Sequence, residues 1–296
     1  MTICIGVLAA NAKAVVCVAD KYITFNEEIL GETDFVKIVS IGENGAHAMI
    51  SGNDDAILRV LAKLELKDDV GKNRSQTARF CEEAYKEAER EMVEMRFLRP
   101  FITTGDYEKA LLKKRVNRVI EAIADEIGKN RGSEEPIFNC ALLFCGFDEH
   151  GNPYILNLAA PGVCTDMTLN GFSAIGSGSG YALQRLLNNE WSRKYPIDRA
   201  LYEVFDAKVQ AENDMNVGYN WDAIVLTSEK VVPLPDDTKK MIDRAWIMLN
   251  RSPYETHDPI EDIPLPPEDW RPQLRTFAET LLPSEPSNQK NGGDSQ

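Results

Sequence analysis

A threonine stands directly behind the initiator methionine, at the start of a short apolar run. Thr2 opens an Ile- and Val-rich stretch, and a second such stretch ends at the carboxylate of Asp20. Because a small second residue usually lets the methionine be removed, we expect Thr2 to carry both a hydroxyl and a free α-amine. An α-amine titrates at about pH 7.7–8.0 and can serve as the base for its own hydroxyl. The residues indicate nucleophilic chemistry at an N-terminal threonine.

An apolar amino terminus can also be a secretory signal peptide, and the small residues around Cys17 resemble a cleavage site. A signal peptide carries a basic segment before an unbroken apolar core. Here the basic segment is missing, and Asn11 and Lys13 interrupt the apolar run. The pattern favours a β-hairpin, with strands over 2–8 and 14–20 that are buried on both faces.

A lysine interrupts the apolar pattern of the strand predicted over 35–41. A lone lysine in such a strand usually lies at an edge, where its long stem lets the charge reach water. Lys37 could instead be a buried cation that pairs with Asp20. Spacing alone leaves both alternatives open.

Composition narrows the class of protein. The 296 residues are 43% hydrophobic and 27% charged, enough to bury a full core. The net charge of −14 argues against binding to nucleic acid or to an anionic membrane surface. The six cysteines have no CxxC spacing and the three histidines form no ligand pattern, so we expect reduced core thiols, no metal and no cofactor in a cytoplasmic protein. The sequence contains no run of 18 apolar residues, so we expect no segment that spans a membrane.

Strands and helices are predicted in alternating blocks. After the strands over 35–51, a cap at 51–54 starts one helix, and an extended helical pair covers about 76–128. A second block of strands over 137–175 leads through the Gly–Ser run at 176–180 into further helices and a closing strand pair over 222–233. This order favours an α/β (α+β) fold with two stacked antiparallel sheets and helices outside, a four-layer α/β/β/α sandwich.

The composition changes after residue 250. Residues 1–250 form the predicted domain, whereas 251–296 holds eight prolines and many acids and is expected to be largely disordered. Leu274, Phe277 and Leu281 make a short amphipathic piece within this tail, for which we expect no fixed structure.

Taken in order, these residues resemble proteasome β-type subunits and their bacterial relatives, the N-terminal-nucleophile (Ntn) hydrolases of HslV and Anbu type. The resemblance runs from Thr2 to about Leu249, outside 97–130. The matching features are Thr2–Val7, Ala19–Asp20, Phe35–Ile38, Ser51–Ala56, Leu142–Asp148 and Ala174–Leu183. It implies the Ntn-hydrolase fold and a threonine-type peptidase.

The resemblance also implies a role for each residue of the catalytic group. Thr2 would be the nucleophile, with its freed amine as the base. Lys37 would ease the loss of the hydroxyl proton, and Asp20 would pair with Lys37. The Gly52 amide would donate a hydrogen bond to the oxyanion.

Four further positions follow from the same resemblance. Ser177 and Asp214 would support the Thr2 amine, while Phe35 and Ile50 would line the pocket for the residue before the cut bond. One departure weakens the match: the family has a serine three residues after Asp214, and this chain has Val217.

The implied partners are a peptide or unfolded-protein substrate and further copies of the chain, in a homo-oligomeric ring or helical assembly. The sequence does not name an ATPase partner. Two alternatives stay open: a catalytically silent scaffold subunit, which Val217 supports, and an Ntn amidase that acts on a small amide.

Overall fold

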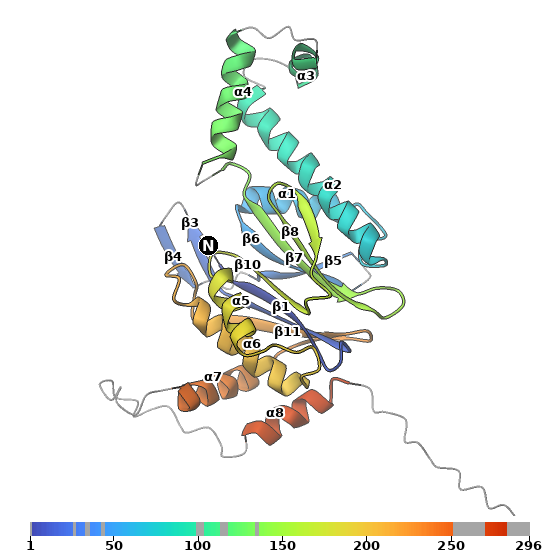
Figure 1. Ribbon diagram of the computed structural model, residues 1–296, viewed down its shortest axis with the longest axis vertical. Helices are drawn as coiled ribbons and strands as arrows, with labels where there is room; N and C mark the ends of the chain where they lie inside the picture. The colour runs from blue at the N-terminus through green and yellow to red at the C-terminus, as the bar shows by residue number, and fades with distance from the viewer. Residues whose placement is uncertain are drawn as a thin grey trace, which may run out of the picture.

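Two five-stranded antiparallel sheets stack face to face, and a layer of helices covers the outer face of each (Figure 1). The computed structural model describes residues 2–25, 28–32, 36–42, 45–98, 104–112, 118–133, 136–250 and 270–282. The predicted four-layer α/β/β/α sandwich is confirmed.

The first sheet has the amino-terminal hairpin at its centre, in the strand order β10-β1-β2-β11-β12. Every residue of β1 and β2 is buried, as predicted for this hairpin. The strands are β1 (Cys4–Ala9), β2 (Ala14–Asp20), β10 (Phe172–Ile175), β11 (Trp221–Thr227) and β12 (Val231–Pro233).

The second sheet follows the strand order β5-β6-β7-β8-β9, and a separate hairpin pairs β3 with β4. The lysine strand is shorter than predicted, because β5 begins after Lys37; Phe35 lies outside the described residues. The strands are β3 (Tyr22–Phe25), β4 (Glu28–Glu32), β5 (Ile38–Ile41), β6 (Ala46–Gly52), β7 (Cys140–Phe147), β8 (Pro153–Ala159) and β9 (Val163–Asp166).

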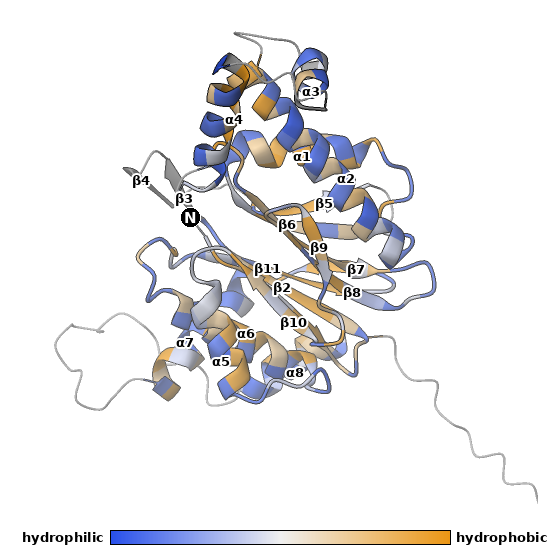
Figure 2. Cartoon of the chain, turned by 45° about the horizontal axis from the view of Figure 1, so that its top comes forward, coloured by the Kyte–Doolittle hydropathy of each residue, from blue (hydrophilic) through white to orange (hydrophobic). Residues whose placement is uncertain are grey.

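Alternate side chains of β1 serve two different cores, because successive residues of a strand face opposite sides of the sheet. Cys4 and Leu8 pack between the sheets, with residues such as Met49 and Leu143 of the second sheet. Ile5 and the other alternate residues pack against the outer helices. Figure 2 shows the strands as the most hydrophobic part of the molecule, with hydrophilic residues on the outer helices.

The first of the helices over the second sheet begins at Asn53, whose side chain caps it by accepting a hydrogen bond from the Ala56 N–H. The helical pair predicted over 76–128 differs from the structure, where a π-helical turn, η1, extends α2 and the rest forms two shorter helices. Residues 113–117 between those two lie outside the described ranges. The elements are α1 (Asp54–Glu65), α2 (Arg74–Val93), η1 (Glu94–Leu98), α3 (Thr104–Leu112) and α4 (Arg118–Arg131).

The first sheet is covered by α5 (Ser179–Asn188), α6 (Ile197–Ala211), α7 (Asp236–Asn250) and α8 (Trp270–Glu279). The expectation of no fixed structure for the amphipathic piece near the carboxyl end is wrong. Its helix α8 and the turn after it bury three side chains in the same core as β1 and α6: Leu274, Ala278 and Leu281.

Candidate active site

The amino-terminal hairpin brings Thr2 beside Asp20. Antiparallel pairing of β1 with β2 sets Cys4 opposite Ala19, and the Asp20 N–H donates to the Ile3 carbonyl at 3.1 Å. Lys37 directly precedes β5 of the second sheet, and its carbonyl accepts a hydrogen bond from the Ile50 N–H of β6 at 3.1 Å. The stacking of the two sheets thus joins three residues that are distant in the sequence.

Asp20 is the centre of this group. Its Oδ1 accepts hydrogen bonds from the Thr2 hydroxyl, from Lys37 Nζ at 2.8 Å and from the Ile3 N–H at 3.0 Å. Its Oδ2 accepts the Gly218 N–H at 3.0 Å. Lys37 Nζ also donates to Thr2 Oγ1.

The Thr2, Asp20 and Lys37 side chains are withdrawn from water. The Lys37 and Asp20 side chains are 5% and 0% exposed, and Thr2 as a residue is 3% exposed. Of the two alternatives for Lys37, the structure shows the buried cation paired with Asp20. A positive charge in contact with a hydroxyl, at low effective dielectric, favours loss of the hydroxyl proton.

Two glycines are required by close approaches of the main chain. Gly52 has φ +124°, and a side chain there would come within 2.3 Å of the Asn139 carbonyl. Gly176 has φ +102°, and a side chain there would come within 2.0 Å of the Thr2 carbonyl. The Gly–Ser run therefore passes directly against the main chain of Thr2, which explains its small residues.

Neither Ser177 nor Asp214 contacts the Thr2 hydroxyl. Ser177 is exposed and forms no hydrogen bond within the described part of the chain. The Asp214 carboxylate instead accepts the N–H and the side-chain amide of Asn216, each at 2.9 Å. Val217 is buried and packs against Gly178, so that the residue replacing the expected serine fills an apolar contact.

Ile50 borders the site through its main chain and turns its side chain elsewhere. Its carbonyl accepts the Cys4 thiol at 3.5 Å, while its side chain, 5% exposed, packs in the core between the second sheet and α1. Burial raises the pKa of the Cys4 thiol to about 12, so it stays protonated. Phe35, the other residue expected to line the pocket, lies outside the described residues.

Sequence reasoning missed the Gly218 N–H as a partner of Asp20. The contact spans 198 positions and depends on β11 pairing with β2, which sets Trp221 opposite Asp20. A glycine in a loop that leads into a buried strand was the available signal.

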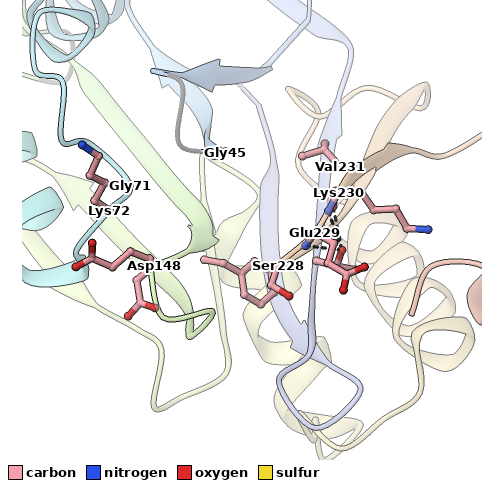
Figure 3. A pocket seen from close by; sticks show the side chains of 11 residues that line it. Gly45, Gly71, Lys72, Asp148, Ser228, Glu229, Lys230 and Val231 are labelled. Carbon is pink, nitrogen blue, oxygen red and sulfur yellow. Dashed lines mark hydrogen bonds between the residues drawn. The ribbon is translucent and has the colours of Figure 1, made fainter. Parts of the chain in front are cut away.

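A pocket lies beside the turns that follow β7 and β11 (Figure 3). Its volume is about 380 Å³, and it opens where β11 ends, beside the turn between β7 and β8. Its lining carries charges of both signs, from Lys72, Asp148, Glu149, Glu229 and Lys230. The ladder that pairs Trp221 with Asp20 pairs Thr227 with Ala14, so the pocket and Thr2 lie at opposite ends of the first sheet.

The described ranges offer neither a candidate metal site nor a candidate membrane span. No group of three His, Cys, Asp or Glu side chains there could hold a metal ion. Among the helices that the structure describes, none is both long and apolar enough to cross a bilayer.

Comparison with known proteins gives a likeness in structure but not in sequence. No family model and no curated protein matches the sequence. A solved Gly-1 mutant of Anbu from Hyphomicrobium sp. strain MC1 is similar with a TM-score of 0.57 and 15% identity, over 84% of this chain and 94% of that one. Eukaryotic HslV from Trypanosoma brucei is similar with a TM-score of 0.48 and 17% identity, over 76% of this chain and 99% of that one. The chain therefore has the fold that its resemblance implied, the two-sheet Ntn-hydrolase sandwich that it shares with Anbu.

Proposed function

We propose that this chain is a threonine-type peptidase that uses Thr2 as its nucleophile after removal of Met1. The observation that carries the proposal is the buried contact of the Thr2 hydroxyl with both Lys37 Nζ and the Asp20 carboxylate. A hydroxyl is a weak nucleophile and needs a base and a favourable field. The freed α-amine supplies the base and Lys37 supplies the field.

The reaction follows from these groups. The neutral amine takes the Oγ1 proton, and Oγ1 attacks the carbonyl carbon of the peptide. The Gly52 N–H donates to the oxyanion, the C–N bond breaks, and the ammonium returns its proton to the leaving amine. Water then attacks the ester on Thr2, with the same amine as base, and releases the second product.

The substrate class is a peptide or an unfolded protein, cleaved inside a homo-oligomeric ring or helical assembly in the cytoplasm. Phe35, which is apolar, would line the pocket for the residue before the cut bond, whereas Ile50 borders the site only through its main chain. A charged residue there would lose its water without gaining a partner, which costs several kcal/mol. We expect a preference for small or medium apolar residues; fastest cleavage after Arg or Glu in a peptide library would contradict it.

A catalytically silent scaffold subunit is the second candidate. Three observations favour it: Val217 packs as a core residue, Asp214 bonds to Asn216, and Ser177 is exposed without a partner among the described residues. These positions would support the amine in the peptidase. Substituting Thr2 in a scaffold would leave every measurable property unchanged.

Cleavage by Thr2 variants separates these candidates. Thr2→Ala removes the nucleophile, whereas Thr2→Ser keeps a hydroxyl, and both keep a small second residue for Met1 removal. We expect an unfolded protein to be cleaved by the wild type, measurably by Thr2→Ser and not by Thr2→Ala. Equal rates in all three overturn the proposal, and turnover of small amides without protein cleavage indicates the Ntn amidase instead.

A further inference from the structure

A second buried lysine lies behind the candidate active site. Lys208, on α6, is fully buried and donates hydrogen bonds to the Glu212 carboxylate and to the main-chain carbonyl of Tyr219. Burial lowers the pKa of Lys208, because desolvation disfavours its charged form. A buried ammonium is costly unless it is well bonded, so its partners indicate its role.

The Tyr219 carbonyl belongs to the loop 212–220, which joins α6 to β11. One residue earlier, the Gly218 N–H donates to Asp20 Oδ2 at 3.0 Å. One residue later, the Asn220 carbonyl accepts the Lys21 N–H at 2.9 Å. Three consecutive residues are thus held between Lys208 on one side and the end of β2 on the other.

Orientation of the Asp20 carboxylate depends on both of its oxygens. Oδ1 accepts hydrogen bonds from Thr2, Lys37 and Ile3, and Oδ2 accepts the Gly218 N–H. If Gly218 moves away, the carboxylate can rotate, and Oδ1 then leaves the hydroxyl and the ammonium that it aligns. An error of about 1 Å in such a group can lower a rate about 100-fold.

The charge of Lys208 is compensated locally. Glu212 pairs with it, and Asp243, whose Oδ1 accepts the Trp221 indole N–H at 2.9 Å, lies in the same cluster. Burial raises the pKa of both Glu212 and Asp243. Lys208 is electrostatically coupled to Asp20 as well, and the paired Glu212 offsets that charge.

We propose that Lys208 is a positioning residue for the candidate nucleophile. It fixes the Tyr219 carbonyl and with it the Gly218 N–H, which orients Asp20 and so aligns Lys37 with Thr2. This inference rests on the proposed function of Thr2, and it adds a residue that neither touches Thr2 nor belongs to the implied catalytic group.

The test is Lys208→Met, which keeps the apolar stem and removes the donor. Its matched control is Lys239→Met, which removes a mostly buried lysine of α7 that pairs with Asp222 and Asp236. In peptide cleavage we expect Lys208→Met to lower kcat about 100-fold with KM unchanged, and Lys239→Met to change neither. Hydrogen exchange in 214–221 should become faster only in Lys208→Met.

A double variant keeps the proposal testable if Lys208→Met does not fold. Replacing a buried ion pair by apolar residues is often neutral for stability, so Lys208→Met with Glu212→Leu keeps the fold and still leaves Tyr219 without its donor. Wild-type kcat in the folded variant overturns the positioning role, as does unchanged exchange in 214–221. If the wild type cleaves nothing and Thr2 takes no covalent probe, the proposed function fails, and the positioning role with it; faster exchange then shows only that Lys208 holds the loop.

Discussion

The two ends of the sandwich both gather lysines and carboxylates, but in opposite environments. At the Thr2 end, the Lys37 and Asp20 side chains are 5% and 0% exposed and meet at a hydroxyl. At the pocket end, Lys72 pairs with Asp69 while both side chains are about half exposed. Exposed pairs contribute little, whereas a buried pair is strongly coupled to its surroundings. Burial of the charged pair against a hydroxyl, and not the size of a cavity, distinguishes the Thr2 end from the pocket end.

The largest effect is expected from removing the lysine at the Thr2 end, compared with removing a lysine at the pocket end. Lys37→Ala leaves Asp20 buried and unpaired, a loss of about 3–5 kcal/mol in the free energy of unfolding, and abolishes peptide cleavage even where the protein folds. Lys37→Arg should fail too, because a guanidinium is not a compact point charge. Lys72→Ala is the control, with wild-type cleavage and stability. If Lys37→Ala, with Met1 removed, cleaves peptide at the wild-type rate, Lys37 has no role in cleavage.

Asp20 separates charge from hydrogen bonding within the Thr2 end. Asp20→Asn keeps an acceptor for Lys37 and the Ile3 N–H, whereas Asp20→Ala keeps none. We expect both to lose cleavage, and chemical denaturation to show Asp20→Ala as the less stable by about 1–3 kcal/mol. Equal stability of the two variants would mean that the acceptor has no role in holding the site together.

Helix α8 lets stability at the pocket end be changed without touching the site. Lys230 of the pocket donates a hydrogen bond to the Thr280 carbonyl just after α8. Leu274, on the buried face of α8, is 1% exposed. Leu274→Ala should lower the free energy of unfolding by about 2–5 kcal/mol and leave kcat unchanged in folded protein. Leu169→Ala, at a residue 86% exposed, should stay within about 0.5 kcal/mol of the wild type. A stability loss no larger than that of Leu169→Ala would show that α8 does not dock.

The smallest effect is expected at Cys4, a buried cysteine near Thr2. Because the pKa of Cys4 is raised to about 12, its thiolate is scarce at pH 8 and increases only as the pH approaches that value. Alkylation of native protein at pH 8, followed by peptide mapping, should label the half-buried Cys164 and leave Cys4 unmodified. Labelling of Cys4 as fast as Cys164 would mean that the Thr2 end is open to reagents.

The sequence predicted what depends on local pattern. The buried hairpin followed from two short Ile- and Val-rich runs, and the four layers followed from the order of strands and helices. Docking of α8 was missed because its apolar face is stable only against a surface formed by distant elements. Lys37 was left open for the same reason, since its partner comes from the other sheet. The role expected for Asp214 stays a prediction, because its bonds to Asn216 involve only one carboxylate oxygen.

The most direct test of Thr2 as the nucleophile is mass spectrometry after treatment with a β-lactone or an epoxyketone. The measurement reads the intact mass and then maps the adduct to a peptide, for the wild type and for Lys37→Ala. We predict that Met1 is absent, that the wild type carries one adduct on Thr2, and that Lys37→Ala carries none. Retention of Met1, or wild-type protein with no adduct on Thr2, would contradict the account.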